Sequence, residues 1–142
     1  MRPEIPGNTG NIGRLAVGLG ARLHLIHPLG FRTDEKAVRR AGIDHWKHVD
    51  VQEHVDAEAF WAWSDGRRVH RFSAHGEQPF TQASFSDGDV LLFGPESVGL
   101  PSTLRSGSYH IPMLGEIRSL NLSNAVAVVC YEWARTVHSE RF

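Results

Sequence analysis

Short apolar runs alternate along the chain with longer segments in which apolar residues recur at helical spacing. The pattern predicts strands over residues 22–27, 68–72, 90–93 and 109–111. It predicts helices over residues 11–19, 33–41, 56–63 and 122–137. Asn8 or Thr9 is available to cap the first helix, and Gly20 to end it. Strands that alternate with helices favour an α/β domain whose mostly parallel sheet is flanked by helices.

The composition of the chain is that of an ordinary globular protein. The chain has 142 residues, of which 41% are hydrophobic and 22% charged. These values are ordinary for globular proteins and predict a single domain over residues 1–142. No apolar run approaches the ~20 residues that span a bilayer, so we expect no membrane partner. The single cysteine, Cys130, excludes a disulfide within the chain and favours a reducing, cytoplasmic location.

The charge of the chain is unevenly distributed. The net charge is -1, but residues 1–50 carry +3 and residues 51–142 carry -4. A basic N-terminal third permits local binding of a polyanion such as RNA. Scattered, solvated surface charge explains the same asymmetry, and the charges alone leave both interpretations open.

Three irregular segments, residues 6–14, 93–101 and 111–124, are not typical of plain connections because glycine, proline and polar residues are frequent in them. The latter two directly follow expected strands. Ligands of open α/β sheets bind beyond the carboxyl ends of the strands, where irregular backbone exposes its N–H and C=O groups. We therefore expect a ligand site built from these segments.

Several common sites do not match the sequence. The glycines at positions 7, 10 and 13 do not have the G-x-G-x-x-G spacing of a dinucleotide site, and no strand precedes them. No Gly-Lys-Ser/Thr indicates a phosphate loop, and Ser97 lacks the preceding glycine of a nucleophile elbow. Histidine pairs occur at 24/27 and 45/48 without the accompanying ligands of a known metal motif, so we expect no metal site.

The three segments resemble those of the SPOUT methyltransferases. The similarity is carried by Asn-Thr-Gly-Asn-Ile-Gly-Arg at 8–14, Phe-Gly-Pro-Glu-Ser-Val-Gly-Leu-Pro at 93–101, Ile-Pro-Met at 111–113, Ser-Leu-Asn-Leu-Ser-Asn-Ala-Val-Ala-Val at 119–128 and Tyr-Glu at 131–132. Residues 34–44 also fit, so the resemblance covers essentially the whole chain. It is greatest to the minimal type that 2′-O-methylates the wobble cytidine or uridine of tRNA. The resemblance implies a C-terminal deep trefoil knot, which is very rare among folds.

The resemblance implies that S-adenosylmethionine binds, bent, in this knot. Backbone near four residues would hold the adenine and ribose: Phe72, Gly94, Ile111 and Ser119. Three side chains would form apolar walls: Met113, Leu114 and Leu120. Glu96 and Asn121 are expected to brace the loops by hydrogen bonds.

The resemblance also implies residue roles in methyl transfer. It places Arg14 at the reacting 2′-hydroxyl, where a cation favours the developing alkoxide. Tyr131 is a second catalytic candidate, for positioning the substrate, and packing between two copies of the chain is its alternative role. Substrate contacts would come from Asn8, Asn11, Arg39 and Arg40. The reaction needs no metal.

The leading hypothesis is a cytoplasmic, homodimeric tRNA methyltransferase that acts on the anticodon stem-loop at cytidine or uridine 34. One alternative keeps the chemistry but changes the target to another tRNA position or to ribosomal RNA. Another is a non-catalytic RNA-binding protein of the same fold. The resemblance further implies a buried strand before residues 3–6, so we expect this first strand to be truncated and the natural start to lie upstream.

Overall fold

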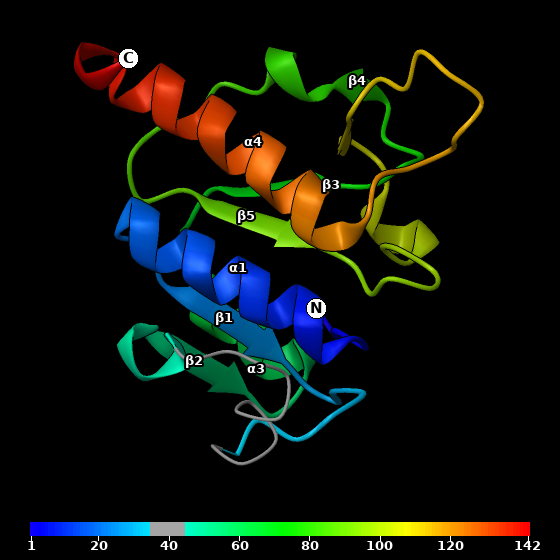
Figure 1. The fold of residues 1–142 in the computed structure, drawn as a ribbon. Helices are drawn as coiled ribbons and strands as arrows, with labels where there is room; N and C mark the ends of the chain where they lie inside the picture. Colours follow the sequence, from blue (N-terminus) through cyan, green and yellow to red (C-terminus); the bar gives the residue numbers. More distant parts are fainter. Residues whose placement is uncertain (35–44) are drawn as a thin grey trace. The chain divides into compact units, whose positions relative to one another are not determined.

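Two parallel strands lie between two helices in the part of the chain that the structure describes within the first of its two units, Met1–Trp63 (Figure 1). The structure is a computed structural model and describes residues 1–34 and 45–142. The elements of this unit are α1 (Pro6–Leu19), β1 (Leu23–Ile26), the short 3-10 helix η1 (Trp46–His48), β2 (Val51–His54) and α3 (Ala57–Trp63). Helix α1 covers β1 on one face of the sheet, and α3 covers β2 on the other.

Helix α1 is longer than the sequence predicts. It begins at Pro6 rather than at residue 11, and Ile5, not Asn8 or Thr9, is its N-cap. Proline suits a first turn because that turn has no partner for its N–H. The expected end is confirmed: Gly20 adopts φ 65°, and its N–H donates to the carbonyls of the last turn. The first half of this helix was not predicted, because it contains glycines at positions 7 and 10 and glycine disfavours helices by about 1 kcal/mol relative to alanine.

Strand β2 pairs with β1 along its whole length, in register from Leu23↔Val51 to Ile26↔His54. At the end of this ladder, His54 is 4% exposed and its Nε2 lies 2.9 Å from Nδ1 of His24. The Trp63 indole lies against the His24 ring, with 4.1 Å between ring centroids. Burial in this aromatic cluster lowers the pKa of His54 from its ordinary 6.5, because the charged form loses hydration.

We expect the buried His54 to make the protein less stable in mild acid. Below about pH 6.5 the unfolded chain binds a proton at His54 that the folded chain binds only at lower pH. The free energy of unfolding should therefore fall as the pH falls below that value. Urea unfolding on either side of it measures the loss, and His54→Gln should show a smaller pH dependence. An equal dependence in wild type and variant would contradict the assignment to His54.

The second unit, Ser64–Phe142, holds a four-stranded sheet of order β4-β6-β3-β5 in which all pairs are parallel. Its elements are β3 (Val69–Phe72), β4 (Gln78–Pro79), η2 (Phe80–Gln82), β5 (Val90–Phe93), η3 (Ser102–Leu104), β6 (Tyr109–His110), α4 (Leu122–Val137) and η4 (Ser139–Arg141). Strand β6 therefore lies between two strands that precede it in the sequence. The predicted α/β class with parallel strands and flanking helices is confirmed; the knot itself and the single-domain organisation stay predictions.

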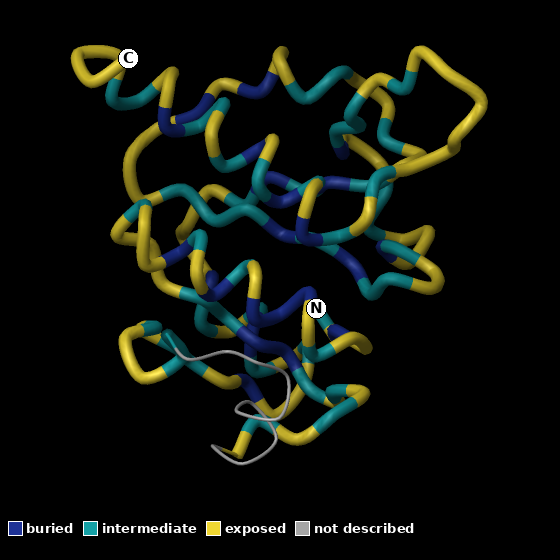
Figure 2. Tube along the Cα trace, viewed as in Figure 1, coloured by how far each residue is buried: buried dark blue, intermediate teal, exposed yellow. Residues whose placement is uncertain are grey.

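The core of this unit lies between the sheet and α4 (Figure 1, Figure 2). Phe72, Phe85 and Val129 are buried together, and the Phe72 ring stacks on that of Phe93 with 5.0 Å between centroids. Trp133 packs against this cluster and donates its indole N–H to the Ser86 carbonyl at 3.1 Å. The helix predicted over residues 122–137 has these bounds. Its buried positions recur along one face, which packs toward the sheet.

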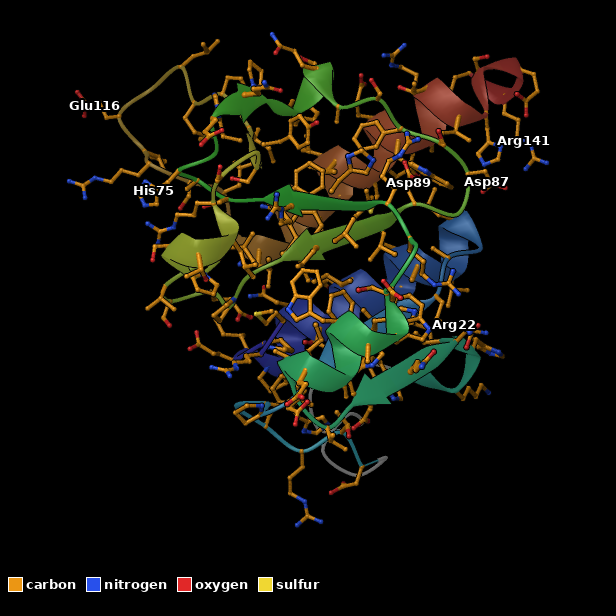
Figure 3. The ribbon with its side chains drawn as sticks, turned by 180° about the vertical axis from the view of Figure 1, so that it is seen from behind. Arg22, His75, Asp87, Asp89, Glu116 and Arg141 are labelled. Atoms are coloured by element: carbon orange, nitrogen blue, oxygen red, sulfur yellow. The ribbon has the colours of Figure 1, made fainter. Side chains whose placement is uncertain are left out.

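A hydrogen bond between two buried side chains braces the amino ends of β3 and β5. His70 and Asp89 have side chains 6% and 5% exposed, and Nε2 of His70 donates to Oδ2 of Asp89 at 2.8 Å. The same oxygen accepts from the Ser86 N–H at 2.7 Å. Arg68 donates to the Ser84 carbonyl at 2.9 Å, so the turn before β5 is held from two sides. Figure 3 shows Asp89 at the end of the strands opposite to Glu116.

Strands predicted over residues 22–27, 68–72, 90–93 and 109–111 are confirmed as β1, β3, β5 and β6, and the helix over 56–63 as α3. Strands β2 and β4 have no counterpart among the predictions. Residues 35–41 of the helix expected over 33–41 lie outside the described residues.

Candidate functional site

The carboxyl ends of β3, β5 and β6 bring three expected cofactor residues to one edge of the sheet. Phe72 ends β3 and is paired in register with Phe93 of β5 and with Tyr109 of β6. Gly94 follows β5 directly, and Ile111 follows β6 directly. Phe72 is 5% exposed and Ile111 packs against the same buried cluster. At this edge, the backbone of three neighbouring strands therefore lies next to apolar side chains of the buried cluster.

The loop after β5, residues 94–101, folds tightly back on itself. A Cβ at Gly94 would lie 2.2 Å from the carbonyl carbon of Gly99, closer than real side chains approach. The Gly99 N–H donates to the Pro95 carbonyl at 2.9 Å, and Gly99 has φ +66°. Leu100 is 0% exposed, and its carbonyl accepts from Nε of Arg105 at 3.0 Å. Glycine is thus needed at 94 for close approach and favoured at 99 for its left-handed backbone.

Replacing Gly94 by alanine should destabilise the second unit. The added methyl group meets backbone, which cannot move as a flexible side chain would, and overpacking of this kind costs about 1–3 kcal/mol. Gly115→Ala is the control, because nothing lies within 4 Å of a Cβ there. Thermal unfolding of both variants measures the difference. An unchanged melting temperature for Gly94→Ala would contradict the close packing of this loop.

The loop after β6, residues 111–121, carries the other expected cofactor residues. Met113 and Leu120 are half-buried, Ser119 is exposed, and Leu114 is fully exposed at 102%. The expected bracing role of Asn121 is confirmed: its Oδ1 accepts from the Ser123 N–H at 2.9 Å and from the Ser123 hydroxyl at 2.7 Å. Because this cap starts α4, the loop is fixed at both of its ends while its middle stays accessible to a ligand.

A third loop, between β3 and β4, contributes to the same edge and was missed from the sequence. A Cβ at Gly76 would lie 2.3 Å from the carbonyl carbon of Tyr109, and the Gly76 carbonyl accepts from Nδ1 of His110 at 2.9 Å. The Ser73 N–H donates to the Tyr109 carbonyl at 2.9 Å. Figure 3 shows His75 and Glu116 on the loops that follow β3 and β6. In the sequence, the glycine at position 76 was the one feature that indicated this loop.

Helix α1 carries the expected substrate residues of the first unit. Arg14 and Asn11 are exposed, whereas Asn8 is 6% exposed. Thr9 is 2% exposed, and its hydroxyl has no hydrogen-bond partner in the part of the chain that the structure describes. Arg39 and Arg40 lie outside the described residues. An exposed arginine on a helix is able to reach a polyanion.

Tyr131 lies on the side of α4 away from the buried cluster. It is 51% exposed, and its ring meets that of Phe142 edge-on, with 6.2 Å between centroids. The neighbouring Cys130 points into the protein, where burial raises the pKa of its thiol to about 12. That thiol stays protonated at neutral pH, so it is no nucleophile, whereas the Tyr131 side chain is accessible.

The described residues contain no group of three His, Cys, Asp or Glu side chains placed to hold a metal ion. Nor is any helix among them long and apolar enough to cross a membrane.

Comparisons with known proteins agree with each other. Residues 1–131 match the family described as the SpoU rRNA Methylase family. The tRNA (cytidine(34)-2'-O)-methyltransferase of Escherichia coli (strain K12) is 44% identical over 135 residues, which cover 92% of this chain and 86% of that protein.

Solved structures extend the similarity to three dimensions. One, described as giving structural insights into the 2-OH methylation of C/U34 on tRNA, has a TM-score of 0.90 at 48% identity, over 97% of this chain and 93% of its own. An AdoMet-bound rRNA methyltransferase from Sinorhizobium meliloti has a TM-score of 0.81 at 28% identity, over 94% of this chain and 53% of its own.

Proposed function

Since this chain belongs to the SpoU rRNA Methylase family, we propose that it transfers a methyl group from S-adenosylmethionine to the ribose 2′-hydroxyl of cytidine or uridine 34, the wobble nucleotide of tRNA. The observation that carries the proposal is the likeness, at 48% identity and a TM-score of 0.90, to a structure described in terms of C/U34 methylation. The relative from Escherichia coli, similar over 92% of this chain, is named for the same reaction.

The residues at the sheet edge fit S-adenosylmethionine. Gly94 and Gly76 let loop backbone pack directly against backbone of neighbouring segments, which fixes the loops whose peptide groups would face the adenine and ribose. We propose that Phe72, Gly94, Ile111 and Ser119 supply this backbone and that Met113, Leu114 and Leu120 close over the apolar parts. The bound cofactor supplies a methyl group already activated on a sulfonium. The exposure of Leu114 supports this role, because a ligand would cover apolar surface that is otherwise in water.

We propose that Arg14 acts on the reacting hydroxyl. A guanidinium is too basic to accept a proton routinely, so it favours loss of the hydroxyl proton by stabilising the alkoxide that develops. Its planar fork is able to hold the hydroxyl and a phosphate oxygen together. Tyr131 positions the substrate, and further contacts to RNA come from Asn11, Arg39 and Arg40. The +3 charge of residues 1–50 supports a polyanionic anticodon stem-loop as the partner.

We propose that the protein works as a homodimer in the cytoplasm. Val128 on α4 and Phe142 at the end of the chain are 39% and 66% exposed, and a second copy would cover these apolar side chains. Sedimentation at micromolar concentration should give twice the monomer mass. A monomer under those conditions would contradict the dimer.

Methyl mapping on tRNA tests the proposed function. The purified protein, S-adenosylmethionine and total tRNA from cells that lack this gene should yield a 2′-O-methyl group at nucleotide 34 of one or more tRNAs. Methylation at another tRNA position, or of ribosomal RNA only, would replace the target. Binding of RNA without any transfer at millimolar cofactor would favour a non-catalytic role.

A further inference from the structure

One face of α1 allows another segment to pack closely against it, because this face carries two buried glycines one turn apart, Gly10 and Gly13. A Cβ at Gly13 would lie 3.1 Å from Cζ3 of Trp46 and 3.2 Å from Cγ2 of Val49. The indole thus packs so closely on the helix that a side chain at position 13 would have to push it back by a few tenths of an ångström. Gly18, on the same helix, has nothing within 4 Å of a Cβ. The close approach is therefore local to the contact with η1.

A polar contact joins the same two elements one turn earlier. Nε2 of His45 lies 3.1 Å from the carbonyl oxygen of Gly10. A carbonyl only accepts hydrogen bonds, so Nε2 carries a proton and donates it. His45 and Trp46 are consecutive in the chain, and together they hold two successive turns of α1. We call these two residues the η1 anchor.

The first half of α1 depends on such contacts. Glycine at positions 7, 10 and 13 disfavours helix by about 1 kcal/mol each relative to alanine, and no side chain caps the N-terminus. A helix of this composition owes its order mainly to tertiary packing. Arg14 follows Gly13 directly and is exposed. The contacts of the η1 anchor therefore help to fix the backbone from which the Arg14 side chain extends.

We propose that His45 and Trp46 are positioning residues for methyl transfer, which hold α1 so that Arg14 meets the ribose hydroxyl. This inference rests on the proposed function. Catalysis by positioning is sensitive to small displacements, because a shift of about 1 Å can cost roughly a hundredfold in rate. The anchor would accordingly affect the rate of the chemical step and leave cofactor affinity unchanged, since the cofactor residues belong to the second unit.

The first experiment compares two glycine substitutions on one helix. In Gly13→Ala, the new methyl group would lie 3.1 Å from the Trp46 ring, so the helix and the ring must move apart by a few tenths of an ångström. We expect single-turnover methyl transfer at saturating tRNA to slow about three- to tenfold. Calorimetric affinity for S-adenosylmethionine should stay within about twofold of wild type. Gly18→Ala is the matched control and should keep the wild-type rate. Double substitution Gly13→Ala/Trp46→Leu should be no slower than the slower of its two single variants, because the variants disrupt one contact.

The second experiment uses the hydrogen bond and does not add volume. His45→Ala removes the donor to Gly10 and should slow the chemical step with unchanged cofactor affinity. His45→Gln retains a side-chain N–H donor, and we expect it to restore most of the lost rate. Lys47→Ala, at the exposed next-but-one position, should behave as wild type. A merely structural role for His45 would lower the melting temperature without this selective loss and rescue.

Each outcome decides the inference. A folded Gly13→Ala with the wild-type rate, an equal loss in Gly18→Ala, or a parallel loss of cofactor affinity would overturn it. If Gly13→Ala does not fold, His45→Ala with the wild-type rate would overturn it instead. A wild-type protein that transfers no methyl group to nucleotide 34 would refute the proposed function, and this inference with it. An active wild type with active anchor variants refutes the anchor alone.

Discussion

Replacing Arg14 by alanine should slow methyl transfer about a hundred- to a thousandfold, because one electrostatic contact to a developing anion is worth about 2.7–4 kcal/mol. The affinity for S-adenosylmethionine should stay unchanged, since the expected cofactor residues all lie in the second unit and Arg14 in the first. Arg14→Lys should also lose most of the rate, because lysine keeps the charge but not the planar fork.

Single-turnover methylation of unmodified tRNA, beside a cofactor titration and a melting curve, measures this effect. Arg22→Ala is the matched control: Arg22 is an exposed arginine whose Nε lies 2.8 Å from Oδ2 of Asp50. A surface pair of this kind is worth about 0–1 kcal/mol in stability, and its loss should leave the rate unchanged. Near-normal turnover in Arg14→Ala would remove Arg14 from the mechanism.

The largest effect on stability is expected at Asp89. Its side chain is 5% exposed and accepts from both His70 and the Ser86 N–H. Asp89→Ala leaves the buried His70 donor without its acceptor, and an unsatisfied buried donor typically costs about 1–3 kcal/mol; it also removes the acceptor of the Ser86 N–H. The turn that receives the Trp133 indole N–H would loosen as well, because it is the same turn that Asp89 holds.

Urea unfolding at neutral pH tests this prediction. Asp87→Ala is the control, since Asp87 is exposed two residues earlier in the same turn and substitutions at such positions usually change stability by less than about 0.5 kcal/mol. Equal midpoints for the two variants would show that the His70–Asp89 pair does not stabilise the fold.

The sequence predicted elements with strong local patterns and missed those that depend on distant partners. Helix α4 has a continuous apolar face, and its predicted bounds match the structure. Strand β2, Val51–His54, is largely polar, and its sequence alone does not indicate a strand. Its order comes from the ladder to β1 and from contacts such as that between His54 and His24, which no local pattern reports.

The candidate site was likewise predicted only in part. The family, its cofactor and the reaction follow from three motifs, and the comparisons confirm the family. The convergence of Phe72, Gly94 and Ile111 follows from parallel strands that end at one edge, which sequence order alone suggested. The loop around Gly76 and the contact of Trp46 with Gly13 were not predicted, because both depend on backbone approach between segments far apart in the chain. The individual roles of the site residues stay predictions.

The position of β6 in its sheet sets an order of events during synthesis. Strand β4 has β6 as its partner in the sheet, and β6 also pairs with β3. On a ribosome, β3 and β5 are free to pair once residue 93 has emerged, whereas β4 must wait unpaired until residue 110 follows. The last strand to be made thus has to enter between two that already exist. Such non-local pairing is intrinsically slow, so the nascent chain exposes a strand edge for longer than its small size would suggest.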